Sequence, residues 1–129
     1  MKKLVIIIVV AVVAAGAVLY FFVLKGEPKP VYDQYSPGDY FVTNVKDSYR
    51  LLKTSVVLEL DSKRMNNELK EKNTLIRDTI IFILRDMDEQ EIKSAEAQDI
   101  LRIEIRKALN KKLETEHIIG VLFNDFVMQ

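Results

Sequence analysis

The chain has 129 residues with 19 basic and 19 acidic side chains, so its formal net charge is zero and no basic excess points to a nucleic acid partner. It has no cysteine, which excludes disulfides, thiolate metal sites and a lipoprotein anchor. Apart from an apolar N-terminal segment, about 90 residues remain, enough to fold around a hydrophobic core alone.

The N-terminal segment carries the strongest pattern in the sequence. Leu4 to Leu24 form an uninterrupted apolar run that follows Lys2 and Lys3. At about 1.5 Å of rise per residue, a helix of this length spans roughly 31 Å, which matches a hydrocarbon core of about 30 Å. Residues 1–24 are therefore predicted to be a single transmembrane helix.

A cleaved secretory signal is the competing interpretation, because Ala15-Gly16-Ala17 has the small-residue form of a cleavage site. The apolar region of a signal is usually about 7 to 15 residues long, so this longer run favours an uncleaved anchor. Lysines on both flanks do not decide the orientation by themselves. Since a very short basic N-terminus usually stays inside, we expect the C-terminal part to face out of the cytoplasm.

Small residues give the predicted anchor one further feature. One helical face carries the set Ala11, Ala14, Ala15 and Val18, with four-residue spacing between two of the alanines. Such a face allows another transmembrane helix to approach closely, although alanine is also common in helices that contact only lipid.

Residues 25–39 are predicted to be a linker. They contain all three prolines and two of the four glycines, a composition that opposes both a helix and a packed core. The segment is expected to be short and semi-stiff and to lie close to the bilayer, either as a contact strip or as a plain spacer.

Residues 40–129 are predicted to form an α+β domain with the order ββααβ. Alternating apolar residues indicate strands over 40–45 and 49–61 that pair as a hairpin. A 3.6-residue period then predicts a helix over about 63–86 and a second over about 95–113, which Ser94 would cap. The pair is expected to cover one face of the sheet.

The segment 117–129 is apolar on both alternating faces through its middle, so we expect a central strand that is buried on both sides.

Catalytic and metal-binding residues are scarce. His117, the single histidine, has no partner evident in the sequence and is expected to be a surface or turn residue. The acidic stretch Asp86, Asp88, Glu89 and Glu91 lacks the spacing and central glycine of a calcium loop, and the four glycines are isolated rather than grouped into a phosphate-binding loop. We expect no catalysis, no cofactor, no metal and no small-molecule substrate.

Several segments together resemble the FliL family of flagellar basal-body-associated proteins. They are the N-terminal anchor, the strand Leu51–Leu60, the stretch Ile76–Ile81 and above all the ending Val121–Gln129, which reads VLFNDFVMQ. The similarity covers the whole chain in order and length. One departure is that Asn73-Thr74-Leu75 stands where family members often carry a proline, which leaves the start of the first helix open.

The resemblance implies a non-enzymatic accessory protein of the flagellar motor at the bacterial inner membrane, beside the stator proteins MotA and MotB. It implies a domain similar to the stomatin-type (SPFH) fold that assembles into a ring around a stator and supports torque generation. The alternative is a membrane-anchored extracytoplasmic scaffold or sensor unrelated to flagella.

Two sets of residues are candidates for these contacts. A ring needs two different patches per subunit, and the hydrophobic residues that the patterns place away from the main core are Leu51, Val57, Phe82 and Ile103; a second minor core is the competing explanation. By the same resemblance, stator contact is assigned to the aromatic residues of the linker and its end, Tyr32, Tyr35, Tyr40 and Phe41, which are equally suited to skim the membrane surface.

Overall fold

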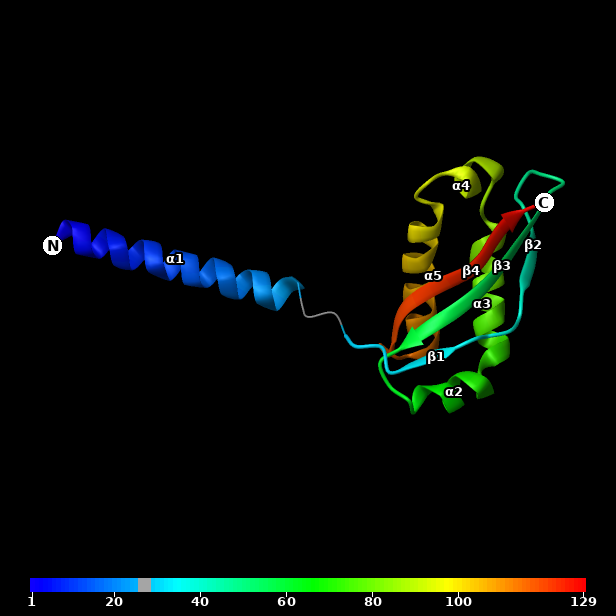
Figure 1. Cartoon of the computed structure of the whole chain (residues 1–129), viewed down its shortest axis with the longest axis horizontal. Coiled ribbons are helices and arrows are strands. Elements are labelled where there is room, and N and C mark those ends of the chain that lie inside the picture. Colours follow the sequence, from blue (N-terminus) through cyan, green and yellow to red (C-terminus); the bar gives the residue numbers. More distant parts are fainter. Residues whose placement is uncertain (26–28) are drawn as a thin grey trace.

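The computed structural model describes residues 1–25 and 29–129. The N-terminal helix α1 (Lys2–Lys25) extends away from a compact domain (Figure 1). Among the described residues, α1 is the one helix whose length and apolar composition would allow it to cross a membrane, over Lys2–Val23. The first part of the predicted linker, residues 26–28, lies outside the described residues.

The domain contains one antiparallel sheet of four strands, β1 (Asp33–Tyr35), β2 (Phe41–Asn44), β3 (Leu51–Leu60) and β4 (Ile118–Met128). β3 is the inner strand, because β1 and β2 pair with its two ends along one edge while β4 pairs with almost its whole length along the other. The predicted hairpin of the second and third strands is confirmed, with Phe41 opposite Thr54 and Asn44 opposite Leu51.

The prediction that the C-terminal strand is central was wrong. β4 is an edge strand, since no other strand in the described part of the chain pairs with its outer side. Its register against β3 shifts twice, between Ser55 and Val56 and between Glu59 and Leu60. Only Ile118 and Val121 of this strand are buried. Phe123, Phe126 and Met128 pack partly against the core, whereas Leu122 and Val127 belong to a sheet face that no helix covers.

Four helices follow β3: α2 (Met65–Glu71), α3 (Asn73–Arg85), α4 (Glu89–Lys93) and α5 (Ala97–Leu113). The single helix predicted over 63–86 is divided at Lys72, whose backbone leaves the helical region. The expectation that Ser94 caps the last helix was also wrong. Ser94 ends α4 instead, and α5 begins after Glu96 without a side-chain cap.

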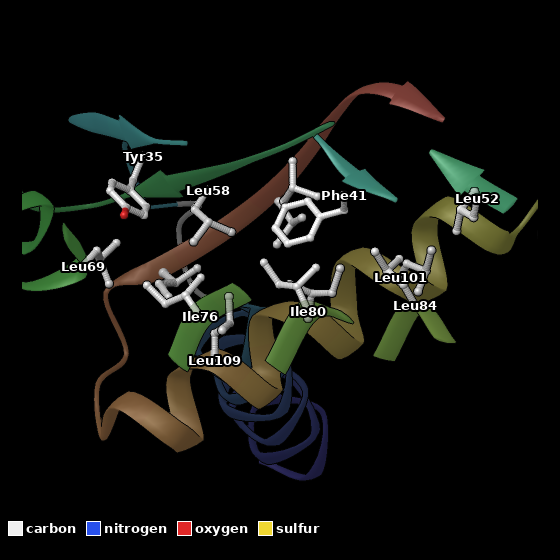
Figure 2. Packing of buried hydrophobic residues seen from close by; sticks show 14 of the residues in the cluster. Tyr35, Phe41, Leu52, Leu58, Leu69, Ile76, Ile80, Leu84, Leu101 and Leu109 are labelled. Carbon is white, nitrogen blue, oxygen red and sulfur yellow. The ribbon is translucent and has the colours of Figure 1, made fainter. Parts of the chain in front are cut away.

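The core lies between the sheet and the two long helices. Figure 2 shows Tyr35, Phe41, Leu52 and Leu58 of the strands facing the apolar side chains of α3 and α5. The fully buried side chains on the helices include Ile76, Ile80, Leu84, Leu101 and Leu109. Full burial of each such side chain contributes roughly 1.5 to 3 kcal/mol, so this layer holds the domain together without disulfides. The α+β class predicted from the sequence is confirmed.

The packed domain begins before residue 40, because β1 lies inside the segment predicted as linker. Its three residues pair with Leu58–Leu60 at the end of β3, and the side chain of Tyr35 enters the core. Backbone pairing with an inner strand therefore outweighs the proline-rich composition around it.

Candidate functional site

The outer face of the sheet is the first candidate for an interaction surface. Alternate residues of β3 point away from the helices, and the register places Val42 and Val127 on either side of Lys53, and Leu122 opposite Val57. Both long helices lie on the opposite face (Figure 1). We call the apolar residues of this face the sheet surface: Tyr40, Val42, Leu51, Val57, Leu122 and Val127.

The second candidate lies on the outside of the helical layer. Phe82 of α3 is 79% exposed and Ile103 of the neighbouring α5 is 48% exposed. We call the apolar residues exposed on these two helices the helix surface: Leu75, Phe82, Ile100 and Ile103. Acidic side chains border it, with Asp78 and Asp86 beside Phe82. The sequence was right that Phe82, Ile103 and Leu51 lie outside the main core, whereas Val57 is half-buried.

The four aromatic residues assigned to a stator contact occupy three different places. Tyr35 and Phe41 are buried in the core, which removes them from any exposed contact surface and corrects that part of the assignment. The Tyr35 hydroxyl donates to Asn73 Oδ1 at 2.6 Å, and burial raises the pKa of this phenol. Tyr32 and Tyr40 remain exposed, Tyr40 on the sheet surface with the Lys53 ammonium 4.1 Å from its ring centroid.

Arg77 of α3 fixes the connection that carries Tyr40 to the sheet surface. Its guanidinium donates to the carbonyl oxygens of Pro37 and Tyr40, both at 3.1 Å, and lies 4.2 Å from the centroid of the Phe41 ring. Gly38 stands beside it with φ of +148°, and a Cβ there would overlap the guanidinium. The sequence contained no signal for this contact, because Arg77 and the loop are about 40 residues apart.

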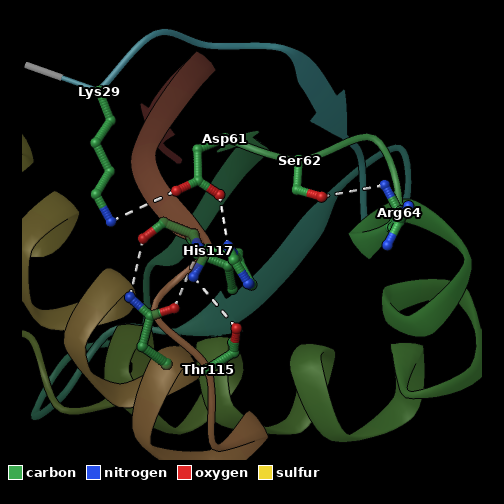
Figure 3. Close-up of polar contacts among 8 residues, drawn as sticks. Lys29, Asp61, Ser62, Arg64, Thr115 and His117 are labelled. Atoms are coloured by element: carbon green, nitrogen blue, oxygen red, sulfur yellow. Dashed lines mark hydrogen bonds and ion pairs between the residues drawn. The ribbon is translucent and has the colours of Figure 1, made fainter.

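Asp61 joins three segments where the linker enters the domain (Figure 3). One of its carboxylate oxygens lies 2.7 Å from His117 Nδ1 and the other lies 3.5 Å from Lys29 Nζ. His117 therefore has a partner that the sequence did not reveal, 56 residues away. The neighbouring Ser62 hydroxyl accepts a hydrogen bond from the Arg64 amide. Asp61 thus ties the linker to the end of β3 and the start of β4, while the Ser62 hydroxyl bonds the Arg64 amide and not His117.

The acidic segment between α3 and α5 has structural roles. Asp88 and Glu91 form a capping box at the start of α4. Ser48 of the hairpin donates to Glu89 at 2.5 Å, and this hydrogen bond, with help from Arg50 and Lys93, lowers the pKa of the Glu89 carboxyl. In the described ranges 1–25 and 29–129, no three His, Cys, Asp or Glu side chains gather into a group that could hold a metal.

The remaining predicted residues, Ala11, Ala14, Ala15 and Val18, lie exposed in α1. Their role in packing against another helix stays a prediction.

A family model described as "Flagellar basal body-associated protein FliL" matches residues 35–129, which is the whole packed domain from the end of β1 onward. The chain belongs to the FliL family. It is similar to a protein named flagellar protein FliL from Aquifex aeolicus, with 29% identity over 107 residues, and to one of the same name from Bacillus subtilis, with 26% identity over 87 residues.

These matches cover 81% and 67% of this chain, and 66% and 61% of the respective FliL relatives. The chain thus aligns with slightly less than two thirds of each relative. The match to the family model extends to Gln129, so it includes the C-terminal VLFNDFVMQ segment on which the resemblance mainly depended.

Proposed function

We propose that this protein is a non-enzymatic accessory of the flagellar motor that is anchored by α1 and assembles beside or around the stator units. Membership of a flagellar basal-body-associated family supports the flagellar assignment. The apolar helix α1 supports a membrane anchor. We place this anchor in the bacterial inner membrane with the domain outside the cytoplasm. The partners in this proposal are MotA and MotB, and the role is support of torque generation.

The proposal that the domain self-associates is supported by the exposed apolar surfaces on both the sheet layer and the helix layer. In a ring of identical subunits, one patch of each copy meets a different patch of the next. The sheet surface and the helix surface are two such patches, on opposite faces. We assign this contact to self-association and infer a stomatin-like arrangement of the domain.

Contact with the stator is assigned to α1 and to the exposed aromatic residues of the linker and its end. The small-residue face of α1 allows a transmembrane helix of a stator protein to approach closely. Tyr32 and Tyr40 are the two exposed aromatic residues left from the original assignment, and Tyr40 is held in place by the Arg77 contact.

A substitution on the helix surface tests this proposal. Phe82→Asp places a charge in the proposed contact, yet its effect on the free energy of unfolding should stay within about 0.5 kcal/mol because the side chain is exposed. The full-length variant should remain folded by circular dichroism, form smaller particles than the parent in detergent by electron microscopy, and fail to restore swimming in cells that lack the gene.

Two matched controls give the test its meaning. Ile80→Asp, two residues earlier on the same helix and fully buried, should unfold the domain. Tyr49→Asp, on the exposed hairpin, should change neither assembly nor swimming. Normal particle size and normal swimming of the Phe82→Asp strain in viscous medium would refute the assigned contact.

A further inference from the structure

The end of the domain at which the linker enters forms a surface of its own. Tyr32 N donates to Leu60 O at 2.9 Å and Asp61 N donates to His117 O at 3.2 Å, so residues 29–32, 61–64 and 110–117 lie together there. Figure 3 shows Lys29, Asp61, Arg64 and His117 around this junction. We call its exposed side chains the base surface: Val31, Tyr32, Lys63, Arg64, Lys111 and Lys112.

Charge is unevenly distributed between this end and the rest of the domain. The three segments contain five basic and three acidic residues, whereas the other residues of 29–129 contain 11 basic and 15 acidic ones. Lys29 is neutralised by Asp61, but in the described part of the chain no carboxylate lies within 4 Å of the four cations of the base surface. Glu114 and Glu116 reduce the excess without cancelling it.

The tether is short. α1 ends at Lys25, and Lys29 is already held against Asp61. Four residue steps span at most about 14 Å, and the headgroup layer on each side of the hydrocarbon core is only about 6 Å thick. If α1 crosses the membrane, the base surface therefore lies at or just above the phospholipid headgroups.

We propose that the base surface binds the headgroups of anionic phospholipids in the leaflet from which α1 emerges. This inference rests on the membrane anchor of the proposed function. Each lysine or arginine near an anionic membrane surface favours the bound state about fivefold, and Tyr32 beside an exposed Val31 is a residue type that prefers the headgroup level. Docking would fix the tilt of the domain and so hold the sheet and helix surfaces in position for neighbouring copies.

Tryptophan fluorescence can test this in the full-length protein, because the chain contains no tryptophan. Tyr32→Trp places a single probe on the base surface, and Tyr49→Trp places one on the exposed hairpin as a control. Each protein is inserted into nanodiscs of phosphatidylcholine with or without phosphatidylglycerol, with a nitroxide quencher attached to the lipid headgroup. We expect strong quenching of the base probe in anionic discs, relief of it by high salt, and little quenching of the hairpin probe.

Neutralising variants assign the effect to residues. Lys111→Gln with Lys112→Gln should lower the ratio of docked to undocked domain about 25-fold, whereas Arg50→Gln with Lys93→Gln at the hairpin and α4 should not change it. Circular dichroism checks that each variant is folded. The comparison between neutral and anionic nanodiscs uses the protein with all its lysines and arginines, so it does not depend on these variants.

Three results would overturn the inference. Quenching of the base probe that is independent of lipid charge and salt would show proximity without binding. Quenching that changes only when stator proteins are added would show a protein partner instead. Failure of the full chain to enter nanodiscs would refute the anchor itself, and is distinguishable because no protein would then co-purify with the discs.

Discussion

Replacement of Arg77 by methionine should destabilise the domain by about 2 to 3 kcal/mol. The substitution removes two hydrogen bonds from a charged donor: the part-buried bond to Pro37 is worth about 1.5 kcal/mol and the exposed bond to Tyr40 about half of that. It also removes the contact with the Phe41 ring, worth roughly 0.5 to 1 kcal/mol, while the methionine side chain retains part of the packing. For a domain of about 100 residues this corresponds to a decrease in Tm of at least about 10 °C.

The assay is denaturant unfolding of the full chain in detergent, followed by circular dichroism. Arg85→Met on the same helix is the matched control, since Arg85 is exposed and should change the free energy of unfolding by less than about 0.5 kcal/mol. A loss below about 1 kcal/mol for Arg77→Met would refute the assignment of these contacts as a clamp on the loop.

Gly38→Ala provides an internal check on the same reasoning. At φ of +148° alanine is strained by about 1 to 3 kcal/mol, and its Cβ also overlaps the Arg77 guanidinium. In the Arg77→Met background only the backbone strain remains, so the two changes should be non-additive by about 1 kcal/mol. Additive effects would show that the glycine is required for its backbone alone.

Two further substitutions test other contacts. Tyr35→Phe should cost about 1 kcal/mol near neutral pH by removing the hydrogen bond to Asn73. Because burial raises the pKa of the phenol in the folded state, the parent keeps the stability of the protonated phenol below about pH 10 and loses it as the pH rises through the raised pKa. The variant should lack this alkaline decrease in a pH series of unfolding curves. Asp61→Asn removes the carboxylate that joins the linker to β3 and β4, and should increase the rate of protease cleavage near Lys29 severalfold at unchanged melting of the domain; equal cleavage rates would show that the tie does not restrain the linker.

The sequence was informative where pattern and contact were local. β3 shows an alternation whose even-numbered apolar residues occupy the buried face in the structure, while Leu51 and Val57 at odd positions lie on the sheet surface. Both long helices were found because their apolar stripes repeat over several turns. The first was predicted as unbroken, since the charged residues around Lys72 include no proline or glycine that would signal an interruption.

The errors come from contacts distant in the sequence and from exposed apolar residues. β1 has only three residues, too few to show a period, and it forms because it reaches the end of an inner strand. The sequence predicted a central position for β4 because both of its alternating faces carry apolar residues. A strand at an edge has the same composition when its outer face is left open, as Leu122 and Val127 show. The aromatic residues Tyr35 and Phe41 were misplaced because residue type alone does not distinguish a core ring from a contact ring.

The end of β4 has a practical consequence for labelling this protein. Gln129 exchanges two backbone hydrogen bonds of 2.8 Å with Leu51, so the last residue is fixed beside a member of the sheet surface. A fluorescent protein fused after Gln129 would start within a few ångströms of that surface and would crowd any partner bound there.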